Sequence, residues 1–487
     1  MSPAVLVLDG TSLTCGQVAA AARGQVRVEM GEQGRQRARA AAELAAVAAA
    51  RRDIYGRTTG VGANSRLTVS AQDAAQHGLR LLHSHAGGGG PLVAAEFGRA
   101  MLVVRANQIA AGGSGVDPGV LDVLADCVNR GLSVPVPMYG AIGTGDLTAL
   151  AVTALCLLGE REWLPEQPAP PRFPLASADA LAFISSNAAT LGEAALTCRD
   201  LAELLRAATL IAAFSHLAVD ASTEPYAAAV HKARPHPGQQ EVAATMRALL
   251  AGRAGPGARI QDPYGYRALP QVHGPAVDAV RNAEQIVTSE INAAAENPLI
   301  DVAGRAVWHN GNFHTAYVGL ALDAVRAGLF QTAALSASRL GTLVEPAFTG
   351  LAPFLATDPP PSSGIMILEY VSHAAIADVR RLAAPAALGS AVLSRGVEEH
   401  AGFSTQSARA TTDVITGYRI VLACELVAAI RAMRLRAIRP AGPSLAEAFD
   451  LAAAALPADT SDRSLDGDLA AAQGLFPQLA GLAVVSA

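Results

Sequence analysis

The sequence predicts an all-α protein: a bundle of long antiparallel helices, preceded by shorter helices and ordered loops. Apolar residues recur at helical spacing after residue 190, as in Leu201, Leu204 and Leu205. Before residue 190, glycine and proline are more frequent and the periodic runs are shorter. We therefore divide the chain into an N-terminal domain, 1–190, and a domain of long helices, 191–487.

Four long helices are expected in the second domain, each from the spacing of its apolar residues. The first lies in the segment RDLAELLRAATLIAAFSHLAVD, and the second runs from Val277 until Pro298 stops it. The third covers roughly Thr315 to Leu340, and the fourth lies in ATTDVITGYRIVLACELVAAIRAMRLR. Such long, alanine-rich helices pack closely side by side, which favours a bundle.

Composition describes a globular protein with a large core, because 51% of the 487 residues are hydrophobic and 16% are charged. The formal net charge is -5, and no block of lysine or arginine could bind phosphates, so nucleic acid is excluded as an expected partner. The N-terminus has no basic segment, and the apolar stretch Ala149–Leu158 is too short to span a bilayer. We expect a cytoplasmic protein with no membrane partner.

The five cysteines are scattered and never form a CxxC pair: Cys15, Cys127, Cys156, Cys198 and Cys424. This pattern favours reduced, buried thiols, and it indicates neither a disulfide nor a metal site.

Several polar clusters interrupt the apolar chain. They are DIYGRTTGVGANSR with Tyr55, LLHSHAGGGG with His85, IQDPYGYRALPQVHG, VWHNGNFHTA and GVEEHAGF. Each cluster alone is typical of a capped helix end or a satisfied polar group, and the histidine cluster lacks the ending of a phosphate loop. Taken together they indicate a functional site.

The blocks YGRTTGVG, QDPYGYRALPQVHG, NAAAENPLI and SSGIM resemble, in order and spacing, the histidine and aromatic amino acid ammonia-lyase family. The resemblance runs from about Tyr55 to about Phe403. It implies an all-helical, fumarase-like architecture and a homotetramer whose active sites are shared between subunits. It also implies an amino acid-like substrate and no external cofactor.

The resemblance implies a role for each matching residue. Tyr55 would remove the β-proton, and Arg267 would hold the substrate carboxylate in a two-pronged hydrogen-bonded pair. The remaining positions would surround the substrate: Tyr264, Gln261 and Phe313 near the electrophile, and His85 and Glu398 at the substrate ring. A glutamate at 398 is similar to the histidine-specific branch, because a carboxylate pairs with imidazole and would be unpaired beside a phenyl ring.

The stretch MYGAIGTGDLTAL departs from the family. There the family has an alanine-serine-glycine tripeptide, which cyclises with loss of two waters to a methylidene-imidazolone electrophile. This chain has Gly143, Thr144 and Gly145, so a cyclised threonine would carry an extra methyl where the substrate amine adds. Ser185 stands at the position of a family asparagine beside this group, and Asn187 lies two residues later.

These residues leave three interpretations open. The first is a lyase that eliminates the amino group of histidine or a related amino acid, with Tyr55 as base and a prosthetic group made from residues 143–145. The second lacks the prosthetic group and performs another elimination, a rearrangement or a 2,3-aminomutase reaction. The third is a non-catalytic binding relative, against which the retained Tyr55, Tyr264, Arg267 and Glu398 argue. Because the first two share lyase-type elimination, that activity is our prediction.

Overall fold

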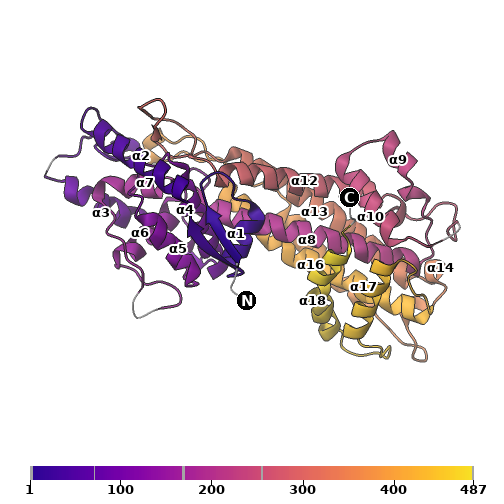
Figure 1. Ribbon diagram of the computed structural model, residues 1–487. Coiled ribbons are helices and arrows are strands. Elements are labelled where there is room, and N and C mark those ends of the chain that lie inside the picture. The colour runs from indigo at the N-terminus through magenta and orange to yellow at the C-terminus, as the bar shows by residue number, and fades with distance from the viewer. Residues whose placement is uncertain (1–3, 71, 167–169, 254–255, 485–487) are drawn as a thin grey trace. The chain divides into compact units, whose positions relative to one another are not determined.

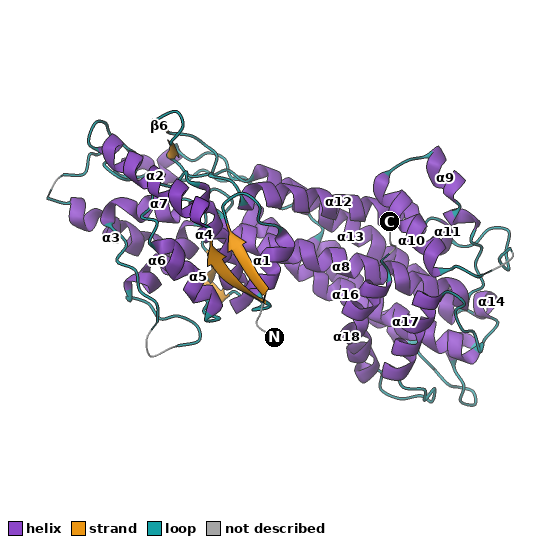
Figure 2. Cartoon of the chain, in the orientation of Figure 1, coloured by secondary structure: helices purple, strands orange, loops and turns teal. Residues whose placement is uncertain are grey.

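The computed structural model describes residues 4–70, 72–166, 170–253 and 256–484, and most of them lie in helices (Figure 1, Figure 2). The helices are α1 (Cys15–Ala22), α2 (Glu32–Ala49), α3 (Ala74–His85), α4 (Ala95–Ala111), α5 (Val120–Asn129), α6 (Leu147–Leu158), α7 (Ala180–Ile184), α8 (Ala188–Ala218), α9 (Ala228–Ala233), α10 (Pro237–Leu249), α11 (Tyr264–Arg267), α12 (Leu269–Ile291), α13 (Ala316–Val344), α14 (Pro346–Thr349), α15 (Ile367–Leu382), α16 (Ser404–Leu435), α17 (Pro443–Ala455) and α18 (Asp466–Leu482). The strands are β1 (Ala4–Leu8), β2 (Val26–Met30), β3 (Gly89–Leu92), β4 (Pro137–Tyr139), β5 (Leu299–Asp301) and β6 (Ala306–Trp308). The all-helical prediction is confirmed, since these strands form only two-stranded pairs.

The contacts between Cα atoms group the chain into two compact units. The first unit contains Met1–Arg199, Ala283–Leu322 and Pro385–Arg409. The second contains Asp200–Asn282, Asp323–Ala384 and Ala410–Ala487. Both units are discontinuous along the chain, whereas the division expected at residue 190 is continuous and stays a prediction.

The core of the first unit is built around α4. Every residue from Ala100 to Ala110 is buried, including the polar Arg105, Asn107 and Gln108. Helices α1, α2 and α5 pack on α4, and the parallel pair β1–β2 pairs Ala4 with Val26 at one end and Leu8 with Met30 at the other. Thr14 begins α1 with a capping box, in which its side chain accepts from the Gln17 amide.

The buried charge of Arg105 in α4 explains the glutamate in the sequence block NAAAENPLI, which is Glu296. The Arg105 guanidinium donates to Glu296 Oε1 at 2.9 Å, and both side chains are almost fully buried. Arg105 also donates to the carbonyls of Phe183 and Ala182. Because its donors are paired, Arg105 ties the segment before β5 to α4 and α7.

The second unit contains the remaining parts of α8, α12, α13 and α16, together with α10, α15, α17 and α18 (Figure 1). Its largest fully buried side chains include Arg339 of α13, which pairs with Glu425 of α16. Helices α17 and α18 pack on each other. The unit therefore has its own core, with a charged pair at its centre.

Two helices in the described residues are long and apolar enough, by length and composition alone, to cross a membrane. One is in the segment Ser177–Ala218, which contains α7 and α8 and whose most apolar window is 83% buried, as is typical of a protein core. The other is α13, whose window is only 56% buried. Among the exposed side chains of α13 are the large apolar ones of Tyr317 and Leu320.

Candidate functional site

The glycine-rich turn connects β4 to α6 and has a backbone that requires its glycines. Gly143 has φ +90° and Gly145 has φ +117°, conformations that residues with a Cβ rarely adopt. A Cβ at position 143 would also lie 2.7 Å from Ser404 Oγ and 2.8 Å from the Ser404 amide nitrogen. Position 143 therefore has no room for the alanine that the family tripeptide carries.

Two buried side chains hold the polar groups of this turn. The Gly145 amide donates to Asn187 Oδ1 at 2.9 Å, and Asn187 Nδ2 donates to the Phe313 carbonyl at 2.7 Å. The Gly143 carbonyl accepts from the Thr315 amide at 3.2 Å and from Thr315 Oγ1 at 2.9 Å. Asn187 is 3% exposed and Thr315 is 1% exposed.

The cost of breaking these contacts follows from their burial. A buried hydrogen bond contributes about 1 kcal/mol to stability, but a buried donor or acceptor that loses its partner costs about 1–3 kcal/mol. Water cannot replace the lost partner at side chains as buried as Asn187 and Thr315. The turn is therefore held in one conformation by its surroundings.

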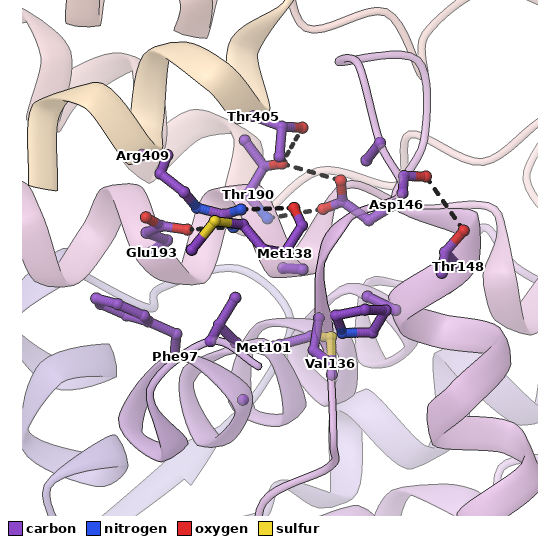
Figure 3. A pocket seen from close by; sticks show the side chains of 17 residues that line it. Phe97, Met101, Val136, Met138, Asp146, Thr148, Thr190, Glu193, Thr405 and Arg409 are labelled. Carbon is purple, nitrogen blue, oxygen red and sulfur yellow. Dashed lines mark hydrogen bonds and ion pairs between the residues drawn. The ribbon is translucent and has the colours of Figure 1, made fainter. Parts of the chain in front are cut away.

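A small cavity with a mainly apolar lining lies beside the turn, in the first unit (Figure 3). Its volume is about 30 Å³, which is room for roughly one water and far too little for an amino acid. Asp146 accepts from the amide and hydroxyl of Thr190, and Arg409 pairs with Glu193 at 3.2 Å. Burial raises the pKa of Asp146 to about 6, although the Thr190 hydrogen bonds lower it. The residues around this cavity anchor the turn, and the cavity itself is too small to be the substrate pocket.

Tyr55 lies on the loop that precedes α3, and its phenol is fixed by the backbone. The Gly62 amide donates to Tyr55 Oη at 2.7 Å, and the Tyr55 amide donates to His309 Nε2 at 3.2 Å. Gly62 has φ +55°, and a Cβ there would collide with Ser394 Oγ and lie 3.5 Å from Glu398 Oε1. Tyr55 and Glu398 therefore both lie beside Gly62.

The environment of Tyr55 disfavours its phenolate. Burial is the largest cause that raises its pKa above the ordinary value, and the negative charge of Glu398 raises it further. The hydrogen bond from Gly62 acts in the opposite direction, because it stabilises the phenolate. Glu398 is held in a bridge with Leu393, whose amide donates to the Glu398 carbonyl at 2.7 Å.

In the second unit, α11 brings three predicted site residues together. Arg267 donates to Gln261 Oε1, and its Cζ lies 4.5 Å from the centroid of the Tyr264 ring. The Arg267 Nε atom is buried, and no hydrogen-bond partner for it occurs among the described residues. Tyr264 is 67% exposed. The guanidinium thus keeps a free donor, which is the property a carboxylate site requires.

Two further predicted residues contact backbone atoms of the chain, and their place at the substrate stays a prediction. Ser185 is buried, but its hydroxyl accepts from the Asn297 amide at 3.2 Å, so it is Asn187 that contacts the turn. His85 ends α3, and its Nδ1 lies 2.9 Å from the Leu81 carbonyl oxygen. The sequence did not predict the contact of Thr315 with the turn, although Thr315 lies in the cluster VWHNGNFHTA, because a hydroxyl two residues after Phe313 gives no signal of where its oxygen will lie.

Another pair was also missed. His314 Nε2 lies 2.9 Å from His400 Nδ1, so the segments that carry Phe313 and Glu398 touch through these rings. Burial and the neighbouring His400 lower the pKa of His314. The residues of the first unit thus form two linked groups: the turn with Asn187 and Phe313, and Tyr55 with Glu398.

Comparisons with known proteins agree with this picture. The chain matches the family described as aromatic amino acid lyase over residues 13–454. It is 35% identical to a histidine ammonia-lyase of Anaeromyxobacter dehalogenans, with 97% of this chain and 98% of that protein covered. Its fold resembles histidine ammonia-lyase from Trypanosoma cruzi, with TM-score 0.90, 26% identity and coverage of 99% and 96%. It also resembles tyrosine aminomutase from Streptomyces globisporus, with TM-score 0.89, 27% identity and coverage of 98% and 97%.

The helical fold is the fumarase-like fold of amino acid lyases and aminomutases. The chain belongs to the aromatic amino acid lyase family, and its activity is that of an ammonia-lyase-like carbon–nitrogen lyase. Members of this family use a prosthetic group made from their own backbone. The resemblance recognised from the sequence blocks is confirmed.

Proposed function

We propose that this protein eliminates the α-nitrogen of histidine or a related amino acid, with Tyr55 as the base. The observation that carries the proposal is the phenol of Tyr55, which is fixed by the Gly62 amide beside the Glu398 carboxylate. Tyr55 Oη takes a proton from the β-carbon, and the electron pair of that C–H bond forms the Cα–Cβ double bond. The nitrogen then leaves the α-carbon with its bonding electrons.

The pH dependence of this step follows from the raised pKa of Tyr55. Only the phenolate can accept the β-proton, and below its pKa the phenolate fraction increases about tenfold per pH unit. We therefore expect kcat/KM to increase with pH through the neutral range. A cationic group or a further hydrogen-bond donor that approached the phenol would lower this pKa.

Substrate binding is assigned to two further groups of residues. Arg267 would bind the carboxylate through its guanidinium, with Tyr264 and Gln261 beside it. Glu398 and His85 would contact the substrate ring, and Phe313 and Ser185 would line the site. A carboxylate at 398 suits an imidazole, which can donate a hydrogen bond or carry a positive charge.

Arg267→Lys is expected to weaken the binding of carboxylate-bearing ligands by about tenfold or more, because an ammonium cannot make the two-pronged contact. Equilibrium titration with a carboxylate-bearing substrate analogue measures this. Arg281→Lys, a half-exposed arginine of the same unit, serves as the control and should leave affinity unchanged. An Arg267→Lys affinity within twofold of wild type would exclude the carboxylate role.

Glu398→Gln is expected to move substrate preference away from imidazole and cationic side chains. The measurement is the ratio of kcat/KM for L-histidine to that for L-phenylalanine, which should decrease about tenfold as the charged partner is lost. Because the Glu398 charge raises the pKa of Tyr55, the pH profile should also shift to lower pH. Glu399→Gln is the matched control, and an unchanged ratio for Glu398→Gln would show that residue 398 does not select the side chain.

The prosthetic group implied for residues 143–145 does not fit the residues present. Ring closure removes the Gly145 amide hydrogen and the Gly143 carbonyl oxygen, which carry the contacts to Asn187 and Thr315. Each buried partner left behind would cost about 1–3 kcal/mol. We therefore derive no step of the reaction from an imidazolone, and no external cofactor is assigned.

A 2,3-aminomutase is the second candidate, favoured by the likeness to tyrosine aminomutase. It would return the nitrogen to the β-carbon after the same elimination. Incubation of the purified protein with L-histidine and related amino acids, followed by mass spectrometry of the products, tests both activities. A conjugated acrylate supports the lyase, and a β-amino acid supports the mutase. Absence of both products would contradict the proposed function.

For the assembly we propose a cytoplasmic homotetramer with shared active sites. Its support is the set of apolar side chains left exposed near the start of α13, where Tyr317 is 73% exposed and Leu320 is 61% exposed. Exposed apolar surface of this kind is typical of subunit interfaces. Light scattering of the purified protein gives the subunit number directly.

A further inference from the structure

We infer that the Gly143–Thr144–Gly145 turn stays an open peptide, so that the elimination proceeds without a backbone-derived electrophile. This inference rests on the proposed elimination, and it adds that no prosthetic group binds the leaving nitrogen covalently. Its basis is the set of hydrogen bonds that end on atoms which a prosthetic group would have to lose.

Cyclisation would form a bond from the Gly145 nitrogen to the Gly143 carbonyl carbon. The first water takes the Gly143 oxygen, with hydrogens from the Gly145 and Thr144 amides. The second water takes the Thr144 hydroxyl and the hydrogen on its Cα, which leaves a double bond from Cα to Cβ. The product therefore contains neither the Gly145 amide hydrogen nor the Gly143 oxygen.

These two groups are the ones that the buried surroundings of the turn hold. The Gly145 amide hydrogen is bound by Asn187 Oδ1, and the Gly143 oxygen is bound by the amide and the hydroxyl of Thr315. Thr315 Oγ1 is itself 2.6 Å from Ser404 Oγ. Closing the ring would leave Asn187 Oδ1 without its donor and the Thr315 amide without its acceptor, both out of contact with water.

The shape of the turn points the same way. Thr144 would place a methyl on the exocyclic carbon of any ring, where an incoming amine has to add. As an open peptide, the turn has partners for the Gly145 amide and the Gly143 carbonyl. A ring would lose both contacts, and the methyl of Thr144 would shield it from an incoming amine.

An open turn restricts the class of substrate. Without an electrophile that binds the nitrogen covalently, the leaving group has to depart from the α-carbon with its bonding pair unaided. Among the substrates proposed above, this favours over histidine itself a derivative whose α-nitrogen is substituted so that it leaves as a neutral amine, with the carboxylate and ring recognised as proposed above.

The test reads the chemical state of the turn directly. Intact-mass measurement of the purified full chain should give the mass encoded by the sequence, and a deficit of two waters would overturn the inference. Hydrogen exchange of the peptide around residues 143–145 should show both the Thr144 and the Gly145 amide hydrogens. A ring would lack both of them.

Asn187→Leu tests the contact itself. Removal of the Asn187 acceptor should increase exchange of the Gly145 amide by about tenfold or more, because that amide loses its buried partner. Asn129→Leu is the matched control, since Asn129 Oδ1 accepts from the Val28 amide at 2.7 Å in the same unit. It should increase exchange at Val28 and leave Gly145 unchanged. If Asn187→Leu does not fold, the wild-type mass still decides.

The two proposals fail in different ways. Loss of two waters in the wild type would overturn the open turn and leave elimination by Tyr55 untouched. Lack of turnover with every substrate tested would contradict the elimination, while an unmodified mass would still support the open turn.

Discussion

Tyr55→Phe should decrease the rate of elimination by about 10²–10⁴-fold, the range in which a positioned base contributes to catalysis. The phenylalanine ring fills the same space, but it has no oxygen to accept the β-proton. Substrate affinity should change little, because Tyr55 acts in the transition state and its contact in the free protein is with the Gly62 amide. The decrease should therefore appear in kcat, measured by steady-state kinetics.

Tyr370→Phe controls for the loss of a tyrosine hydroxyl as such, because Tyr370 is 66% exposed and lies outside the proposed site. Its kcat should equal that of the wild type. Residual activity of Tyr55→Phe should also lose the dependence on pH that the phenol causes. Full activity in Tyr55→Phe would remove the base from the mechanism, and the proposed elimination would have to be abandoned.

The long helices could be predicted because each carries its own periodic signal. The four expected segments correspond to α8, α12, α13 and α16. The ends of these helices were predicted less accurately than their positions. The second helix was expected to continue until Pro298, but α12 already ends at Ile291. Pro275, which a local rule would place at a helix end, lies inside α12.

The site was only partly accessible from sequence. Tyr55 and Glu398 could be singled out by resemblance, and the structure places both beside Gly62. The partners of the turn could not be found, because Thr315 is distant from it in sequence and an isolated threonine carries no motif. Side chains that hydrogen-bond to a turn can be identified only from the distances between their atoms and the turn. Those distances are set by tertiary packing.

Arg339→Met is expected to destabilise the protein by about 3–5 kcal/mol, because it leaves a buried carboxylate without its charge partner. Arg339 and Glu425 are both fully buried, with Nε to Oε1 at 2.6 Å and Nη2 to Oε2 at 2.8 Å. The Ser215 hydroxyl also donates to Glu425, at 2.7 Å, but a hydroxyl cannot neutralise the charge. The free energy of unfolding in urea, at one fixed protein concentration, measures the loss.

The same substitution should affect the site as well as the core. Arg339 Nη1 donates at 3.2 Å to the carbonyl of Gly265, which lies between Tyr264 and Arg267 in α11. The double variant Arg339→Met/Glu425→Leu should regain much of the lost stability, since an apolar pair of similar volume replaces the ion pair. Arg439→Met removes one partner of the exposed Arg439–Asp450 pair and should cost less than about 1 kcal/mol. If Arg339→Met cost no more than Arg439→Met, the buried pair would not be the support of α11, and the position of Arg267 would need another explanation.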